Sequence, residues 1–506
     1  MIVDLSSAEP GDLTCEVCVV GSGCGGGTAA RLLAEAGRDV IVLEEGGDLT
    51  GDRLTQREAA MYDQLYMDRG GRATDDLAIS VLQGRALGGG PAINMGDVVP
   101  IPAGVLAHWR RAHGLTDLTE AALRPHVEAA LADLRASRIP EDMVNRANGL
   151  LRAGAEAHGW RGEVMMHNRV GCVGLGTCLI GCPVDAKQGP RFVAIPAAIA
   201  AGARFFTRAR AVRIDDSSAE LKRVRVRALD ARGYHERGGL TVRARVVVIA
   251  ANAVGTAQLL LRSGIGNEQV GRHLMLQPQL PLVALFREQV RPFEGIPQSY
   301  ALTEFERDDD PDHGLWGFRI EGVMGTPGIV ASLLPFVGGE AKRLMTLYPR
   351  LAASLLLVPD EPSGRVELHD DGRPRIHYEH KDNHKERLRA AVKAGARAYL
   401  AAGAEQVVVP VVPPVVIRGE ADLVQVDRIP FLPATAPLLS AHQQGSVRFA
   451  SSPRAGAADP AGQVYGTRGV YAFDSSGFPS SASSHTMTPI ITVSRYLTSR
   501  LAAEWA

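Results

Sequence analysis

A short apolar run, Val17 to Val20, is followed by small residues and then by apolar positions spaced three and four residues apart. The unbroken run is typical of a buried strand, and the spacing after it is typical of one face of a helix. The residues that share this face are Ala29, Leu32, Leu33 and Ala36. A second apolar run, Val40 to Leu43, predicts another buried strand. The start of the chain therefore predicts a strand, a helix and a strand in succession.

The C-terminal part of the chain predicts a similar succession. The apolar stretch Val470–Phe473 predicts a strand. An apolar stripe follows at helical spacing, formed by Ile490, Val493, Leu497 and Leu501. Thr488 is the predicted N-cap and Pro489 the predicted first helical position, because a threonine oxygen accepts from free backbone N–H groups and proline has no N–H to leave unpaired. The chain is thus expected to end in a helix.

Between these ends, Gly364–His380 predicts a β-hairpin and Lys385–Ala404 predicts a long helix. Two apolar runs, Gly325–Gly339 and Leu351–Val358, fit either the lining of an apolar tunnel or ordinary core, and core is the favoured interpretation. The most apolar short stretch, Val407–Ile417, contains three prolines, which exclude a helix interior. No apolar run reaches the ~18 residues of a membrane-spanning helix.

Four residues between the first strand and the end of the second suggest a nucleotide site. Gly21, Gly23 and Gly26 form a G-x-G-x-x-G pattern directly after the strand, and Glu44 directly follows the second strand. In such a unit the glycines permit a tight turn, close approach to a pyrophosphate, and helix–strand packing. An acid about 20 residues further on binds an unphosphorylated ribose. The order of these features predicts a dinucleotide site for FAD or NAD rather than NADP.

The size and composition of the chain limit the other possibilities. A chain of 506 residues is too long for one core, which stops growing near ~250–300 residues, so two domains are expected. The chain has 55 Lys+Arg and 56 Asp+Glu, giving a net charge of −1 that does not favour a nucleic-acid partner. The N-terminus lacks the basic start and apolar stretch of a signal peptide, and a cytoplasmic protein is the expectation.

A second glycine-rich stretch, Leu82–Asn94, distinguishes the two dinucleotides. It contains four glycines and an asparagine within thirteen residues. An NAD enzyme has no need of this second loop, whereas a flavin must be held along the length of its isoalloxazine ring. The stretch therefore favours FAD.

Four segments together resemble the glucose-methanol-choline (GMC) family of FAD oxidoreductases. They are the first glycine motif with Glu44, the stretch Gly84–Asn94, the strand-turn-helix segment Ala244–Gly266, and the C-terminal segments Ser440–Phe449 and Val470–Ile490. The segment Val170–Pro190 is similar to the branch that holds fatty-alcohol oxidases and related bacterial enzymes. The spelling Ser-Ser-His-Thr-Met-Thr around His485 is instead similar to the glucose-oxidase branch.

The resemblance implies an α/β fold with two domains. A Rossmann-like FAD-binding domain would comprise residues 1–100, 190–275 and 435–506. A substrate-binding α+β domain with an antiparallel sheet would comprise residues 101–189 and 276–434, with the predicted hairpin as part of that sheet.

The resemblance also implies the site residues. His442 is expected to act as the general base for an alcohol proton, with His485 beside it, because histidine titrates close to working pH. The further flavin contacts that it implies are Gly88, Gly89, Asn94, Val212, Asp474 and Thr486. Met95 stands where covalent-flavin relatives carry histidine, which predicts noncovalent FAD.

Cys172, Cys178 and Cys182 lie close together in sequence, and His167 precedes them. Structural zinc favours CxxC pairs and iron–sulfur clusters favour four cysteines, so neither metal matches this spacing well. A disulfide is a second alternative, and simple packing of the thiols is the favoured interpretation. No metal is expected.

The function expected from the resemblance is oxidation of a primary alcohol with an apolar body, long-chain or aryl, to the aldehyde. Oxygen or another electron acceptor would then reoxidise the flavin. The alternatives are a lyase, a light-driven decarboxylase, or an alcohol or sugar dehydrogenase with a non-oxygen acceptor. A decarboxylase would not need the paired histidines.

Overall fold

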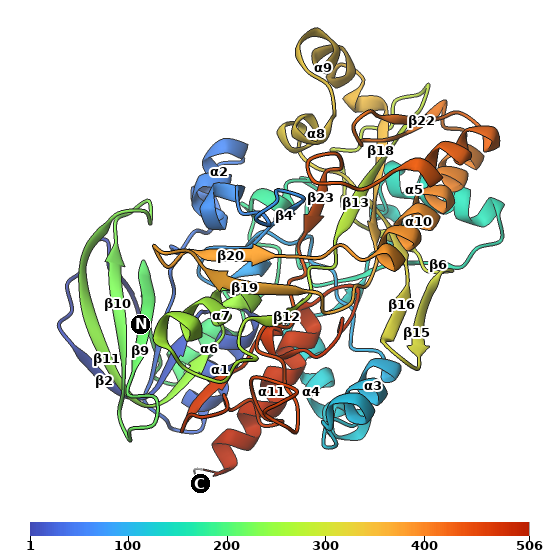
Figure 1. Cartoon of the computed structure of the whole chain (residues 1–506). Coiled ribbons are helices and arrows are strands. Elements are labelled where there is room, and N and C mark those ends of the chain that lie inside the picture. Colours follow the sequence, from blue (N-terminus) through green and yellow to red (C-terminus); the bar gives the residue numbers. More distant parts are fainter. Residues whose placement is uncertain (505–506) are drawn as a thin grey trace.

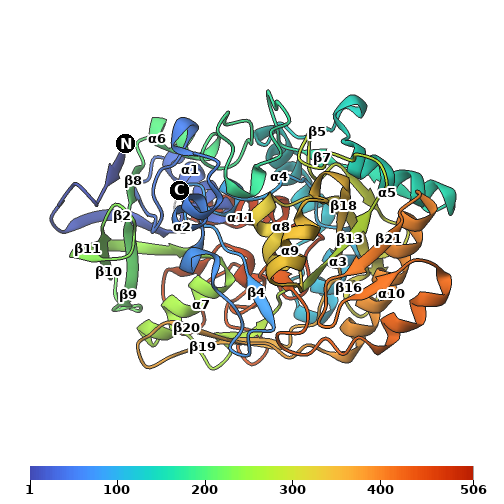
Figure 2. The same cartoon turned by 90° about the horizontal axis from the view of Figure 1, so that it is seen from above.

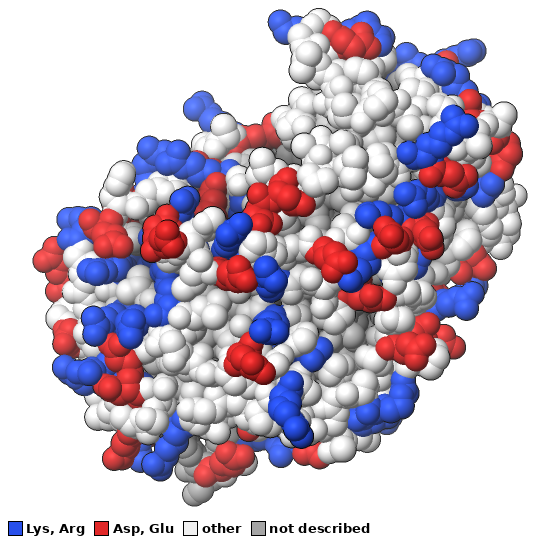
Figure 3. All heavy atoms as spheres, in the orientation of Figure 1, with Lys and Arg blue, Asp and Glu red and all other residues white. Residues whose placement is uncertain are grey.

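The computed structural model describes residues 1–504. Two large sheets divide the molecule, one at the left and one at the upper right of Figure 1. The view from above in Figure 2 places the chain's first and last helices near the first sheet and the long helix α10 at the opposite end. Figure 3 shows acidic and basic side chains interspersed over the visible face, without a broad patch of one sign.

The first sheet carries the strand-helix-strand unit that the sequence predicted. Within the described residues it has eight strands, and its centre is parallel, with β2 (Leu13–Val20) between β3 (Val40–Leu43) and β11 (Glu236–Ile249). The other strands are β1 (Ile2–Asp4), β8 (Arg204–Thr207), β9 (Ala209–Asp215), β10 (Lys222–Leu229) and β24 (Val470–Ala472). Helix α1 (Cys24–Glu35) buries Ala29 and Leu33, but Ala36 lies beyond its end and is exposed.

The second sheet is largely antiparallel, as expected for a GMC-like substrate domain. The strands along its path within the described residues are β22 (Val415–Ile417), β21 (Gln406–Val409), β13 (Gln279–Leu285), β18 (Leu351–Leu357), β17 (Arg319–Val323), β14 (Tyr300–Leu302) and β6 (Gly162–Val164). The strand β23 (Leu438–Ser440) pairs with β13, and β4 (Ile79–Val81) pairs with β23. Both lie in segments predicted for the FAD-binding domain, so these segments cross to the second sheet.

The predicted hairpin is present, but it belongs to neither large sheet. Its strands β19 (Gly364–Leu368) and β20 (Pro374–His377) pair with each other, and β19 also pairs with β12 (Arg272–Leu274), in a separate three-stranded sheet. Side chains of the helix that follows β11 reach it, because Arg262 Nε donates to Gly372 O at 2.7 Å. The assignment of the hairpin to the antiparallel sheet of the substrate domain was therefore wrong.

The remaining elements are mostly helices that cover the two large sheets (Figures 1 and 2). The helices are α2 (Glu58–Leu65), α3 (Ala103–His113), α4 (Glu120–Asp133), α5 (Arg146–Ala157), α6 (Ala194–Ala200), α7 (Asn252–Ser263), α8 (Pro327–Leu333), α9 (Gly338–Met345), α10 (Asp382–Ala401) and α11 (Met487–Glu504). The short strand pairs are β5 (Ser137–Arg138) with β7 (Met166–His167) and β15 (Glu306–Asp310) with β16 (Gly314–Gly317). Among residues 1–504, no helix combines the length and apolarity that crossing a bilayer requires.

The last helix starts earlier than predicted. Helix α11 begins at Met487, and the carbonyl of Thr486 accepts from Ile490 N at 3.0 Å, which places Thr486 at the N-cap and Thr488 inside the first turn. The predicted stripe is largely buried, with Val493, Leu497 and Leu501 in the core. The helix starts two residues after His485 and so fixes that histidine at the junction of both sheets.

Candidate active site

A cavity of about 760 Å³ is lined by residues of both large sheets. The β2–α1 turn and the loop after β4 form one end of it, and strands β13, β17 and β18 with helix α8 form the other end. Its lining includes the two predicted histidines and, of the predicted flavin contacts, Gly21, Gly23, Glu44, Gly89, Asn94, Asp474 and Thr486. Most residues singled out from the sequence therefore meet at one cavity.

The first glycine motif has the backbone geometry that the sequence predicted. Gly21 has φ +96, and a Cβ there would lie 2.3 Å from the carbonyl oxygen of Ala250. A Cβ on Gly26 would lie 1.9 Å from the carbonyl oxygen of Gly21, so this glycine serves helix–strand packing and does not line the cavity. The turn thus presents bare backbone and the start of α1 to the cavity, the arrangement that binds a diphosphate.

Glu44 is buried at the end of β3 and lines the same end of the cavity. Its Oε2 accepts from Ser22 Oγ at 2.6 Å, and its Oε1 accepts from Gly46 N at 2.7 Å. Burial raises the pKa of this carboxyl despite these hydrogen bonds. The residue is placed where a ribose-binding acid belongs in this type of fold.

The second glycine loop lies directly against the first. Gly89 has φ +68, and a Cβ there would lie 2.6 Å from Gly23 Cα. Gly88 (φ +95) donates its N–H to Ser22 Oγ at 3.0 Å and supports the turn without lining the cavity. Asn94 follows with a buried Oδ1 that has no partner in the described chain. Two touching glycine loops and an unpaired amide oxygen form a cradle that fits FAD.

Asp474 and Val212 differ in how they meet the prediction. Asp474 is buried and lines the cavity, while its Oδ1 caps the short helix η8 (Ser475–Gly477) through Ser476 N at 2.8 Å. Thr256 Oγ1 donates to its Oδ2 at 2.6 Å. Val212 lies outside the cavity, whose lining includes Ala209–Ala211 of the same strand instead. The register between β9 and β10 shifts at this point, where Ala211 pairs with Val226 and Arg213 with Arg225, and this bulge places Val212 off the cavity wall.

His442 and His485 lie side by side on the cavity wall. Their ring centroids are 5.1 Å apart with an interplanar angle of 73°. His442 Nδ1 lies 2.7 Å from Gln277 Oε1, a contact that needs a proton on Nδ1, and 3.0 Å from Gln279 Nε2, a contact that needs a lone pair there. The shorter contact favours the proton on Nδ1. His442 Nε2 and His485 Nδ1 have no hydrogen-bond partner in residues 1–504. Each ring thus keeps one nitrogen open.

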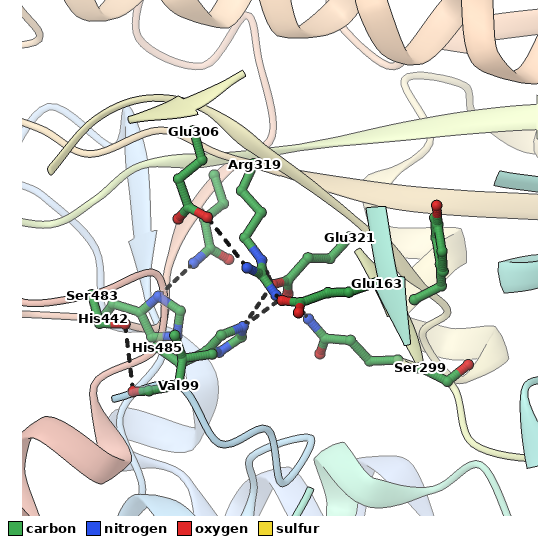
Figure 4. A network of polar contacts seen from close by, with 12 residues as sticks. Val99, Glu163, Ser299, Glu306, Arg319, Glu321, His442, Ser483 and His485 are labelled. Atoms are coloured by element: carbon green, nitrogen blue, oxygen red, sulfur yellow. Dashed lines mark hydrogen bonds and ion pairs between the residues drawn. The ribbon is translucent and has the colours of Figure 1, made fainter. Parts of the chain in front are cut away.

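The other nitrogen of His485 belongs to a buried charge network (Figure 4). His485 Nε2 lies 2.8 Å from Glu321 Oε2 and 3.0 Å from Oε1. Arg319 Nε donates to Glu321 Oε1 at 2.6 Å, and Gln298 also donates to this carboxylate. The guanidinium of Arg319 in turn lies 3.3 Å from Glu306 and from Glu163.

The surroundings of the two imidazoles favour opposite charge states. Burial, and secondly the charge of His485, lowers the pKa of His442 to about 3, so this ring stays neutral. Burial alone would lower the pKa of His485, but the charge and hydrogen bond of Glu321 outweigh it and raise this pKa. The pKa of Glu321 is lowered because His485 and Arg319 outweigh its own burial. The surroundings therefore favour a neutral ring at His442 and a positively charged ring at His485.

A second carboxylate, Asp97, lines the cavity near this pair. It is buried, its Oδ1 has no partner within residues 1–504, and burial raises its pKa to about 6. The charges of His485 and Arg169 act against that rise. Asp97 and Glu321 were both missed from the sequence. The Arg-x-Glu spacing of Arg319 and Glu321 within an apolar strand was a usable signal, because it places both charges on one face.

The far end of the cavity is aliphatic. Its lining from the second sheet and the segment around α8 consists of Pro281, Val283, Val323, Met324, Ile329, Val330, Leu333, Leu334, Ala353, Leu355 and Leu357. Both apolar runs from the sequence contribute, so interpreting them as core alone was incomplete. In β18, Ala352 and Leu356 are core while Ala353 and Leu355 face the cavity, since a strand presents two faces.

The cysteine-containing segment lies against the second glycine loop. Cys172, Cys178 and Cys182 are half-buried free thiols, the state that the favoured interpretation expects. The buried ammonium of Lys187 donates to the carbonyls of Ala92, Asn94 and Cys178 at 2.9, 2.8 and 2.9 Å. Burial lowers the pKa of this lysine to about 8. The segment thereby ties down the loop that carries Asn94.

Solved structures with the same architecture support this description of the fold. Pyridoxine 4-oxidase from Mesorbium loti superposes with a TM-score of 0.72 at 16% identity, over 96% of this chain and 99% of that one. A formate oxidase mutant from Aspergillus oryzae superposes with a TM-score of 0.69 at 14% identity, over 98% and 99%. At these identities the likeness concerns the fold alone.

Sequence comparisons extend the likeness to a family. An uncharacterized GMC-type oxidoreductase of Mycobacterium tuberculosis is 34% identical over 95% of this chain and 74% of its own length. A long-chain-alcohol oxidase of Arabidopsis thaliana is 29% identical over 95% of this chain and 66% of its own length. A family model for an NAD(P)-binding Rossmann-like domain matches residues 19–77, and two models for GMC oxidoreductase match residues 62–279 and 360–494. With its glycine cradle, two-sheet fold and paired histidines, the chain belongs to the GMC oxidoreductase family, whose cofactor is FAD.

Proposed function

We propose that this protein oxidises a primary alcohol with an apolar body, long-chain or aryl, to the aldehyde, using noncovalent FAD. The observation that carries the proposal is the pair of open nitrogens, His442 Nε2 and His485 Nδ1, on adjacent rings whose other nitrogens contact neutral amides and a carboxylate, respectively. Alcohol oxidation needs a base for the hydroxyl proton and a donor for the oxygen that remains. The two rings supply one of each.

His442 is assigned the base. Its Nδ1 proton is held by Gln277, so the Nε2 lone pair is the atom that accepts the hydroxyl proton. His485 is assigned the donor, because Glu321 holds its Nε2–H and leaves Nδ1–H to bind the substrate oxygen. When bound, FAD supplies the two-electron acceptor for the hydride that leaves the carbon. Placement of the alcohol between the rings directs the loss of both proton and hydride.

The lining of the far end supports the choice of substrate. The cavity-lining residues of β13, β17, β18 and α8 are almost all aliphatic, with Gln279 at the histidine end. Burial of an alkyl chain there is favourable by about 0.8 kcal/mol per CH₂. A sugar would leave hydroxyls without partners against this wall, which costs binding energy. The similarity to a plant long-chain-alcohol oxidase agrees with an alkyl chain.

The test is anaerobic mixing of the flavin-loaded protein with a panel of alkanols, aryl alcohols and hexoses. Bleaching of the flavin absorption by the apolar alcohols is the expected result. Admission of air then identifies the acceptor, because rapid recolouring with peroxide formation marks an oxidase and slow recolouring marks another acceptor. Reduction by hexoses without reduction by any apolar alcohol would overturn the proposal.

A further inference from the structure

The aliphatic wall of the cavity includes a helix with little core behind it. Helix α8 contributes Ile329, Val330 and Leu333 to the lining, and Val330 is its only buried residue. That residue packs in a small apolar cluster separate from the main core, together with Tyr348. Helix α9, which follows, has no buried residue, and the pair projects at the top of Figure 1. Apolar packing alone therefore holds helix α8 only weakly against the cavity.

A carboxylate from a distant part of the chain supplies the missing support. Glu58, the first residue of α2, accepts from Gly328 N at 2.8 Å through Oε2 and from Ile329 N at 3.2 Å through Oε1. Thr326 Oγ1 donates to the same carboxylate. Thr326 does not cap α8 with its own side chain. Glu58 thus satisfies N–H groups that the start of a helix otherwise leaves unpaired.

Helices α2 and α8 approach each other closely at Glu58 and Gly328. A Cβ on Gly328 would lie 2.6 Å from Glu58 Oε2, so only glycine permits the present geometry without displacement. On the other side of the same turn, Tyr348 donates its hydroxyl to Gly325 O at 2.7 Å. Four hydrogen bonds thus hold the beginning of α8, and the carboxylate of Glu58 accepts three of them.

We propose that Glu58 is a positioning residue for substrate selection: it fixes α8 on the cavity and thereby sets which apolar alcohols bind. This inference rests on the proposed function, because α8 forms the wall that an apolar body would contact. Glu58 does not line the cavity and contacts neither histidine. Its loss should weaken binding of alcohols long enough to reach α8 and leave the chemical step unchanged.

The kinetic test uses the flavin-loaded protein with short and long 1-alkanols. Glu58→Ala should raise KM about 10-fold for long alkanols, the effect of losing a charged hydrogen-bond network, with kcat within about twofold. Gly328→Ala should act in the same direction, although alanine is the better helix former. Glu58→Gln should be intermediate because it keeps one acceptor oxygen. Glu128→Ala, at an exposed glutamate of α4, is the matched control.

Hydrogen exchange of residues 327–333 tests the same inference without turnover. Exchange should be about 10-fold faster in Glu58→Ala and in Gly328→Ala, and the double variant should be no faster than either single one, because both break one contact. Unchanged exchange and unchanged KM in Glu58→Ala would overturn the inference. If no alcohol reduces the flavin but exchange responds as expected, the proposed function fails and the support of α8 by Glu58 stands.

Discussion

Replacement of Glu321 by Gln tests the charge assignment of the two histidines directly. The substitution keeps the volume and a hydrogen-bond acceptor beside His485 but removes the negative charge. Two unit charges about 4 Å apart attract by about 4 kcal/mol at an effective dielectric constant of about 20. This attraction exceeds the 1.36 kcal/mol that changes a protonation equilibrium about tenfold, so its loss should lower the pKa of His485 substantially. Arg319 remains nearby and also disfavours a protonated ring.

Asp97 still favours a protonated ring, but without the hydrogen-bonded carboxylate His485 should lose its proton at lower pH than in the wild type. Loss of a charged donor to the developing alkoxide should slow flavin reduction by about 10²–10³-fold. The rate of flavin reduction should also depend on pH in a definite direction. The pKa of His485 is raised, so the wild-type rate should hold below that pKa and fall as pH rises through it. In the variant the fall should begin at lower pH. Protonation of His442 should not limit the wild type until pH approaches about 3.

The assay is stopped-flow flavin reduction under anaerobic conditions across pH, normalised to bound flavin. Glu306→Gln is the matched control, because it removes a carboxylate 3.3 Å from Arg319 without contacting His485. Thermal unfolding of both variants should accompany the kinetics, since breaking a buried ion pair costs about 3–5 kcal/mol. A folded, flavin-loaded Glu321→Gln protein with the wild-type rate and pH profile would refute the reasoning.

Three further predictions concern the histidines and the cofactor. Replacement of His442 by Ala should abolish most flavin reduction, whereas His485→Asn should be milder because an amide N–H still donates; equal rates in wild type and His442→Ala would show that the base is wrongly assigned. Gly89→Ala should reduce the flavin content of purified protein, as its Cβ would lie 2.6 Å from Gly23 Cα and spread the cradle; full loading with unchanged absorption would contradict this. Acid precipitation should leave the yellow colour in the supernatant, and a yellow pellet would indicate a covalent flavin.

The local parts of the site could be predicted from the sequence. Gly21 and Gly89 both have a positive φ, which favours glycine whatever surrounds it, so the local sequence marks these positions. The placement of His442 and His485 came from the family resemblance. The start of α11 was misplaced because Thr486 and Thr488 are equally suited to cap a helix, and packing of the preceding loop decides between them.

The charged surroundings of the histidines could not be predicted in the same way. Glu321 lies 164 residues before His485 in the chain, and its contact depends on how the second sheet meets the last helix. Asp97 follows the second glycine loop, and only the fold shows that its carboxylate faces the cavity. Contacts between distant segments carry no local periodicity, so sequence patterns indicate the reacting groups more readily than the groups that set their charge.

The hydrogen-bond partners of His442 and His485 differ in charge, and this difference decides where protons are held during the proposed reaction. Burial lowers the pKa of both imidazoles, but only His485 is compensated, because the partners of His442 are neutral amides and that of His485 is a carboxylate. The charge of His485 lowers the pKa of His442 further, so the pair favours a single positive charge, which His485 carries. Transfer of a substrate proton to His442 places a second positive charge on rings 5.1 Å apart. That state is unfavourable, and His442 should release its proton readily when the aldehyde departs, which returns the site to its starting charge.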